Sequence, residues 1–493
     1  MVSPEIRSKY TATIGIECHV QLKTATKLFA AVGNDAREAP PNTLVSPICF
    51  GLPGTLPVLN REAVHLGMRA AYALGTTPQP FSTFDRKHYF YPDLPMGYQI
   101  TQYEHPIVLG GFVDVEVDGQ QKRIGITRAH LEADAGKSTH PTGKDYSLVD
   151  LNRAGTPLLE IVSEPDMHTA AEAKAYAHEL YLRMRYADVS DCSLYYGNMR
   201  FDVNVSVSTT DTLGTRTETK NINSFRAVEK TVEYEINRQI EVLEKGGTIV
   251  QETRGWDDAK QRTFTQRTKE DAHDYRYFPD PDIPPVELAA EWIDAVKNEM
   301  PTMPDEWRTR LSGLGLDKPA METLLEAELD DPAVSYLGLI EGVMGEKEFA
   351  KTLANWFVNL EIPLRRSDGF ATNPHLTNQG RLEVYRAVAA LVADGKLSSS
   401  NAKTLITDML TGSEQPNDVA EYAKRHNLIQ ESDSGALEVI VKKVIAENPK
   451  AAEDVKSGEM KAIGFLVGQI MKASQGRANP ALAQDLIKKQ LGL

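Results

Sequence analysis

Three stretches of the chain place acidic side chains, two of them with histidine nearby, inside β-like apolar runs. The first reads IGIECHVQL over residues 14–22. Successive side chains of an extended strand point to opposite faces, so Glu17 and His19 share one face and the apolar residues share the other. A carboxylate and an imidazole about 7 Å apart along a strand either hold a cation between them or face water.

Two further stretches repeat this arrangement. In RIGITRAHLEADAGK, His130, Glu132 and Asp134 share one face of the predicted strand. In LLEIVSEPD, Glu160 is flanked by apolar residues, where burying an unpaired carboxylate is costly. Carboxylates from three strands, with a histidine beside them, would form the oxygen-rich site that a hard divalent cation requires. Separate salt bridges or charges at a sheet edge are the alternative.

Several common catalytic motifs are excluded. The GKS of residues 136–138 resembles the end of a P-loop, but that motif requires glycine where this chain has Leu131, and the stretch is predicted as a strand entering a turn. No GxGxxG, GxSxG or HExxH motif occurs. The cysteines lie in no recognisable nucleophile setting: Cys18, Cys49 and Cys192. We therefore expect no nucleophile from this chain, and any ATP would be held by another architecture.

Two segments are rich in aromatic and basic residues. Residues 84–103 include Arg86 and Lys87, which shortly precede three aromatic residues. Such a segment either grips a polyanion and stacks on a base, or is a loop anchored by its aromatic side chains. Residues 274–285, DYRYFPDPDIPP, have a similar composition, and the alternative for them is a rigid connector between domains.

The elements that must position these residues divide the chain in two. Up to about residue 285, short β-like runs alternate with turns and with helical patterns at 168–187 and 225–246, which predicts an N-terminal α+β cradle domain rich in antiparallel strands. The Pro-rich segment 279–288 predicts a boundary, and helical spacing dominates beyond it. The predicted domains are 1–292, a middle helical domain at 293–410 and an all-α tail domain at 411–493.

Composition limits the class of protein. The chain has 493 residues, of which 41% are hydrophobic and 25% charged, and no apolar run approaches the roughly 20 residues of a membrane span. The N-terminus lacks a basic region followed by an apolar stretch, and three scattered cysteines suit neither a disulfide framework nor a zinc site. We therefore expect a cytoplasmic protein with reduced thiols.

The charge is unevenly distributed. A net charge of −15 counts against nucleic-acid binding. From Lys456 to Leu493, however, the sequence contains six basic residues and only two acidic ones. The alternative for this local excess is chance clustering on a solvated helix.

Seven motifs, in order, resemble those of the GatB family, which forms one subunit of the bacterial tRNA-dependent amidotransferases. They are IGIECHVQL, GLPGTLPVLN, FDRKHYFYPDLPMGYQI, RAHLEADAGK, DLNRAGTPLLEIVSEPD, TKNINSFRAVEKTVEYEI and KEDAHDYRYFPDPDIPP. The likeness runs from about residue 11 to the C-terminus, where FLVGQIMKASQGRANP resembles the signature of YqeY-like tail domains.

The resemblance implies an enzyme that uses ATP and Mg²⁺ to phosphorylate the aminoacyl carboxylate of misacylated Asp-tRNA(Asn) or Glu-tRNA(Gln). Ammonia from glutamine, released by a separate amidase subunit, would then form the amide, and a small third subunit would complete a heterotrimer. A carboxylate needs a good leaving group before amidation, and its phosphorylation calls for positioning and charge neutralisation rather than a protein nucleophile.

The resemblance also assigns residues. It implies metal ligation by Glu17, His19, Glu132 and Glu160, and catalytic roles for Glu132, Lys87 and Arg86, the last two near phosphate or the ammonia path. The polar residues of TKNINSFR, together with Arg267 and Lys269, receive no individual roles. In the tail, the resemblance implies phosphate contacts to tRNA from four residues: Lys456, Lys461, Lys472 and Arg477. A tRNA-binding scaffold without catalysis and a stand-alone metal-dependent hydrolase of RNA are the competing hypotheses.

Overall fold

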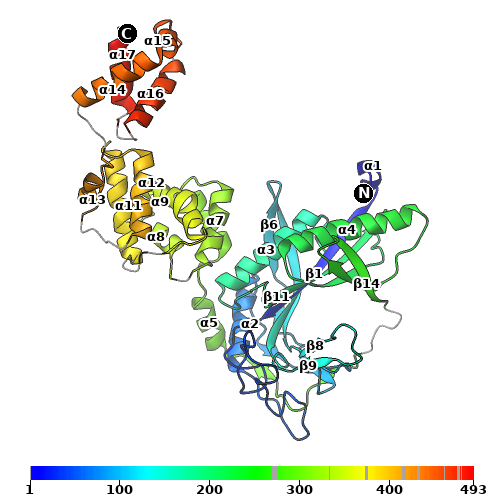
Figure 1. Ribbon diagram of the computed structural model, residues 1–493. Coiled ribbons are helices and arrows are strands. Elements are labelled where there is room, and N and C mark those ends of the chain that lie inside the picture. The colour runs from blue at the N-terminus through cyan, green and yellow to red at the C-terminus, as the bar shows by residue number, and fades with distance from the viewer. Residues whose placement is uncertain are drawn as a thin grey trace. The chain divides into compact units, whose positions relative to one another are not determined.

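The computed structural model describes residues 2–268, 275–331, 333–371, 373, 376–412, 418–429, 434–459, 461–474, 478 and 480–493. It divides into two compact units, Met1–Pro304 and Asp305–Leu493 (Figure 1). The first unit combines a large, mostly antiparallel sheet with helices, and the described part of the second is helical. The predicted fold class, an α+β part followed by helical parts, is therefore confirmed. No helix within the described ranges is long and apolar enough to cross a membrane.

A 12-stranded sheet forms the centre of the first unit. Its strands follow in this order: β14 (Arg262–Thr268), β13 (Glu252–Asp257), β12 (Thr217–Ile222), β11 (Met199–Ser208), β1 (Thr11–Gln21), β10 (Pro157–Ser163), β7 (Gln120–Ala133), β4 (Tyr98–Thr101), β3 (Asp85–His88) and β15 (Phe278–Pro279). β5 (Val108–Leu109) and β6 (Phe112–Val117) also pair with β7, and only β12 and β13 run parallel among the described pairs. The three stretches with acidic side chains thus become neighbouring strands.

Strand β1 lies between β10 and β11 and alternates between two environments. Ile16, Cys18 and Val20 are at most 1% exposed, whereas Glu17 and His19 are half-buried on the other face. This alternation confirms the periodicity predicted from the sequence. One face of the sheet belongs to the apolar core, and the other carries the polar side chains.

Helices α3 (Ala170–Tyr186) and α4 (Phe225–Glu244) pack against each other and against strands β6 and β11 (Figure 1). α3 begins with a capping box of Thr169 and Glu172, and α4 begins at Ser224, whose side chain accepts a hydrogen bond from a backbone N–H of the first turn. α4 ends before Gly246, whose φ of +74° suits glycine, as predicted. Their apolar residues join the core formed by the inner face of β1.

The Pro-rich segment lies in the first unit, close to where that unit ends. Its beginning forms β15, which pairs with β3, and its end forms β16 (Val286–Glu287), which pairs with β2 (Phe81–Ser82). The compact unit continues to Pro304 and includes α5 (Ala290–Asn298). Pro279 is tolerated in β15 because that strand is only two residues long and lies at the edge of the sheet. The remaining elements of this unit are α1 (Pro4–Arg7), α2 (Arg61–Ala73), β8 (Lys137–Thr139) and β9 (Leu148–Asp150).

The second unit is built from short helices. They are α6 (Pro304–Ser312), α7 (Lys318–Glu328), α8 (Tyr336–Glu341), α9 (Lys347–Trp356), the π-helical turn η1 (Phe357–Glu361), α10 (Ile362–Arg365), α11 (Asn378–Ala393), α12 (Ser399–Thr411), α13 (Val419–Arg425), α14 (Ser434–Glu447), α15 (Pro449–Lys456), α16 (Lys461–Ala473) and α17 (Pro480–Leu491). Residues of the last four helices form an apolar core of their own. The division of this part at residue 411 stays a prediction.

Candidate functional site

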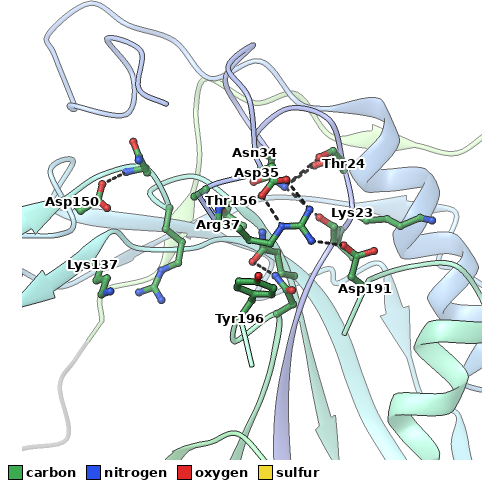
Figure 2. A pocket seen from close by; sticks show the side chains of 16 residues that line it. Lys23, Thr24, Asn34, Asp35, Arg37, Lys137, Asp150, Thr156, Asp191 and Tyr196 are labelled. Carbon is green, nitrogen blue, oxygen red and sulfur yellow. Dashed lines mark hydrogen bonds and ion pairs between the residues drawn. The ribbon is translucent and has the colours of Figure 1, made fainter. Parts of the chain in front are cut away.

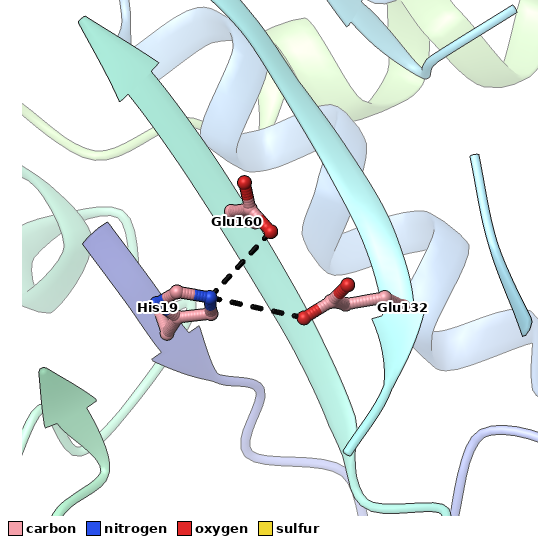
Figure 3. A group of neighbouring side chains, drawn as sticks. All are labelled: His19, Glu132 and Glu160. Atoms are coloured by element: carbon pink, nitrogen blue, oxygen red, sulfur yellow. Dashed lines mark ion pairs between the residues drawn. The ribbon is translucent and has the colours of Figure 1, made fainter. Parts of the chain in front are cut away.

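Three side chains from neighbouring strands meet on the polar face of the sheet (Figure 3). His19 Nε2 of β1 lies 3.5 Å from Glu160 Oε2 of β10 and 3.9 Å from Glu132 Oε1 of β7. The register explains the meeting, because His19 and Glu160 are directly opposite each other. These three side chains offer one imidazole nitrogen and carboxylate oxygens within 4.8 Å of one another, which is the donor set of a divalent cation site.

His130 adds a second imidazole to this group. It lies opposite Glu160 in the β10–β7 register, and its Nε2 is 3.5 Å from Glu160 Oε2 and 3.9 Å from Glu132 Oε2. Glu132 Oε2 is buried and has no hydrogen-bond partner in the described part of the chain. A buried carboxylate oxygen without a donor is costly, so the group fits a bound cation that would satisfy this oxygen.

A second acidic group adjoins the first. Glu17, Asp202 of β11 and Glu218 of β12 bring carboxylate oxygens within 4.8 Å of one another. Lys220 Nζ lies 3.0 Å from both Asp202 Oδ2 and Glu218 Oε1, and Asn204 donates a hydrogen bond to Glu17 Oε1 at 3.1 Å. The structure therefore places Glu17 in this group, whereas the other three predicted ligands form the first.

The two groups are electrostatically coupled. Burial raises the pKa of Glu17, and the nearby carboxylates of Glu160 and Glu218 raise it further. Burial lowers the pKa of His19, but the hydrogen bond and charge of Glu160 outweigh it and hold this pKa at about 9. Burial opposes ionisation of Glu160, yet the charges of His130 and His19 bring its pKa well below the ordinary value. Without a bound cation, His19 is therefore protonated and Glu160 ionised at neutral pH.

A polar cavity of about 410 Å³ opens over the first group. Lys87 of β3 and Arg200 of β11 line it together with His19, Glu132 and Glu160. Burial lowers the pKa of Lys87, but the carboxylates of Glu132 and Glu160 outweigh this and raise it, so the amine stays charged. The cavity thus combines acidic donors for a cation with basic groups for an anion.

The sequence reasoning missed Arg200. It lies opposite His19 in the β1–β11 register, and its Nη2 contacts Asp134 Oδ2 at 3.2 Å. Arg153 Nε approaches the same oxygen at 3.3 Å. The available signal was the alternation of MRFDVNV, which puts Arg200, Asp202 and Asn204 on one face of a strand.

Two family models match this chain. A family model described as "GatB/GatE catalytic domain" matches residues 12–294, and a second described as "GatB domain" matches residues 339–491. The GatB subunit of the aspartyl/glutamyl-tRNA(Asn/Gln) amidotransferase of Thermoanaerobacter pseudethanolicus is 45% identical over 98% of this chain and 99% of its own length. The chain belongs to this family. The corresponding subunits of Moorella thermoacetica and Halorhodospira halophila are 44% and 45% identical, over 98% of this chain and 100% and 99% of their own lengths.

Arg86 does not join the cavity that its neighbour Lys87 lines. Its guanidinium Nε lies 2.8 Å from Asp280 Oδ2, and its Nη2 lies 2.9 Å from Asp282 Oδ2, across the β3–β15 pair. It also sits over the ring of Tyr98, 4.4 Å from the centroid. Adjacent residues of a strand point to opposite faces, so Arg86 anchors the strand that carries Lys87.

The remaining family motifs divide between the cavity and the surface. Lys220 and Asn221 line the cavity, and the backbone N–H of Asn221 donates to Asp202 Oδ1 at 2.8 Å. Ser224 caps α4, whereas Asn223 and Arg226 are exposed. Arg267 lies in β14. The tail residues Lys456, Lys461 and Lys472 are exposed. Lys269 and Arg477 lie outside the described residues.

Proposed function

We propose that this chain activates the aminoacyl carboxylate of misacylated Asp-tRNA(Asn) or Glu-tRNA(Gln) by ATP-dependent phosphorylation and then directs its amidation. Family membership gives the overall reaction: a tRNA-dependent amidotransferase forms Asn-tRNA or Gln-tRNA. The observation that carries the proposal is the meeting of His19, Glu132 and Glu160 beneath a cavity that also holds Lys87 and Arg200.

The chemistry requires that several anions come together. A carboxylate oxygen must attack the terminal phosphorus of ATP with loss of ADP, and ammonia must then attack the acyl carbon with loss of phosphate. Mg²⁺ held by His19, Glu132 and Glu160 would supply positive charge against the phosphoryl oxygens. Glu17 would support this site from the adjoining acidic group.

The chain's own cations complete the arrangement. Lys87 is positioned to bind the carboxylate undergoing reaction, since it is charged and lies in the cavity with Glu132 and Glu160. Arg200 has a guanidinium with five N–H donors, and Asp134 takes only part of this capacity. It is therefore suited to hold phosphoryl oxygens during transfer. No side chain in this account acts as a nucleophile, in agreement with the sequence.

The proposal includes the assembly. A separate amidase subunit would supply ammonia from glutamine, and a small third subunit would complete a heterotrimer, in the cytoplasm where tRNA is charged. Exposed Lys456, Lys461 and Lys472 would contact tRNA phosphates without reading sequence.

The test is Glu132→Gln in the complex with its partners, supplied with Mg²⁺, ATP, glutamine and each misacylated tRNA. We expect amide formation to fall at least about 100-fold, because the variant loses the negatively charged carboxylate that would bind the cation beneath the cavity. Glutamine hydrolysis should remain measurable. The matched control is Glu164→Gln, just beyond β10, where the carboxylate instead accepts a hydrogen bond from Thr127 at 2.8 Å. Equal loss of both activities, or a loss in the control, would point to an assembly role instead.

A further inference from the structure

A second polar cavity, of about 450 Å³, has Asn34, Arg37 and Tyr196 in its lining (Figure 2). Arg153 lines both cavities. Gln21 also lines the second one and lies two residues beyond His19 on the same face of β1, a step of about 7 Å along a strand. A ligand in this cavity would therefore reach the His19 group with a short extension.

The buried side-chain atoms of this cavity that lack a hydrogen-bond partner within the described residues are oxygens. Asn34 and Asn198 are at least nine-tenths buried, and the amide oxygen of each has no hydrogen-bond partner in the described ranges. Their amide nitrogens are already used: Asn34 Nδ2 donates to Leu22 O at 3.3 Å, and Asn198 Nδ2 donates to Gln21 Oε1 at 2.9 Å. The buried hydroxyl of Thr156 is likewise without a partner in the part of the chain described. A fitting ligand must bring N–H or O–H donors.

Of the cations that line this cavity, Lys23, Arg37 and Arg153 are paired with carboxylates, whereas the exposed Lys137 has no ion pair within the described residues. Arg37 donates to both oxygens of Asp35, at 2.8 and 2.7 Å, and to Asp191 Oδ2 at 3.4 Å (Figure 2). Lys23 is paired with Asp188. A ligand recognised mainly through phosphate charge would find only Lys137 unpaired and would have to displace the carboxylates from Arg37 and Lys23, so a ligand that brings hydrogen-bond donors fits better.

An aromatic surface borders the same cavity. Tyr196 lines it with a side chain that is half exposed, and the Arg37 guanidinium lies 5.7 Å from the ring centroid (Figure 2). The neighbouring Tyr195 is 89% exposed and does not line the cavity. Flat exposed rings of this kind stack on the bases of single-stranded nucleic-acid ends.

We propose that this cavity binds the aminoacylated terminal nucleoside of the tRNA. The α-ammonium group and the free ribose hydroxyl donate hydrogen bonds to the oxygens of Asn34, Asn198 and Thr156. The terminal base stacks on Tyr196. The side-chain carboxylate of the amino acid then extends towards His19 and Lys87. This assignment rests on the proposed function and adds the place where the substrate's acyl end is held.

The test uses the full heterotrimer and a stable analogue of the acyl end, 3′-deoxy-3′-(L-glutamylamino)adenosine, whose amide replaces the labile ester. Its inhibition constant against Glu-tRNA and its direct binding without ATP, Mg²⁺ or glutamine are measured. We expect Tyr196→Ala to weaken both by roughly 5- to 100-fold, the range for loss of one stacked base. Tyr196→Phe, which keeps the ring, should restore binding. Tyr195 is unsuitable as a control because its ring packs edge-to-face on Tyr196, with 5.0 Å between the ring centroids. Tyr146→Ala is the matched control: that ring is 52% exposed and lines neither cavity, so its loss should change neither value more than about twofold.

Other outcomes identify other occupants. A raised KM for ATP in Tyr196→Ala with unchanged analogue binding would assign the cavity to the nucleotide and overturn the proposal. Unchanged values for both ligands would also overturn it. Failure of the proposed function can be told apart from failure of this cavity assignment. In the first case, the wild-type complex would bind the analogue but transfer no phosphoryl group, or Glu132→Gln would keep full activity.

Discussion

Replacing Glu160 by Gln should change how cation binding depends on pH. His19 Nε2 lies 3.5 Å from Glu160 Oε2, and the pKa of His19 is raised from 6.5 to about 9. That shift corresponds to about 3 kcal/mol. A unit charge pair at this separation is worth roughly 5 kcal/mol at an effective dielectric constant of about 20. The contribution of Glu160 therefore exceeds the net shift, and the variant should return the pKa of His19 to its ordinary value or below.

The consequence is a change in proton release. A cation must displace the proton from His19, so the wild-type protein should release roughly one proton per cation at pH 7.5. Its affinity should then rise about tenfold per pH unit below about pH 9 and level off above. In Glu160→Gln, His19 is already neutral at pH 7.5, so release should fall to roughly a tenth of a proton and the pH dependence should flatten. Overall affinity should also fall, because one charged ligand is gone.

Calorimetric titration of Mg²⁺ or Mn²⁺ in two buffers with different ionisation enthalpies gives the proton number directly. The control variant Glu164→Gln keeps the carboxylate opposite His19 and should keep the wild-type slope. A wild-type protein that binds the cation without releasing a proton would refute the reasoning, since His19 would then be no ligand. The same slope in Glu160→Gln would show that another group holds the proton on His19.

Two further predictions concern the frame of the site and the tail. Arg86→Ala leaves the fully buried Asp280 side chain without its cation, so thermal or urea unfolding should show the first unit destabilised by about 3–5 kcal/mol. Arg86→Lys should recover part of this stability. An unchanged unfolding midpoint in Arg86→Ala would show that the ion pair contributes nothing. Truncation from residue 411 should weaken tRNA binding in a filter or fluorescence assay, and the difference should shrink as salt rises, while cation binding is retained; an unaltered tRNA affinity would remove the tail from the interface.

The local part of this site was predictable from the sequence, and the long-range part was not. Strand alternation alone put Glu17 and His19 on one face, because that periodicity belongs to a single strand. It could not show that Arg200 lies opposite His19, because register between strands is set by burial and turns elsewhere in the chain. Nor could it show that Arg86 pairs with Asp280, a residue 194 positions away.

The Pro-rich segment shows what a local rule leaves open. Proline interrupts a central strand or a helix, so the run at 279–288 predicts a domain boundary near it but not which strands its ends pair with. The structure places its ends at two sheet edges, where a missing N–H costs little, and Asp280 and Asp282 hold Arg86 from there. The ion pairs of the two aspartates with Arg86 join this segment to strand β3.

Strand β1 relates the two acidic groups to the neighbouring cavity. Its polar face presents Glu17, His19 and Gln21 in order, so steps of about 7 Å separate the second acidic group, the first group and the cavity lined by Gln21. Because β1 is paired on both sides over this length, a shift of one residue would turn all three side chains into the apolar core. Under the proposed assignment, binding of the acyl end and activation of its carboxylate would depend on the same register, and substitutions that loosen β1 should impair both together.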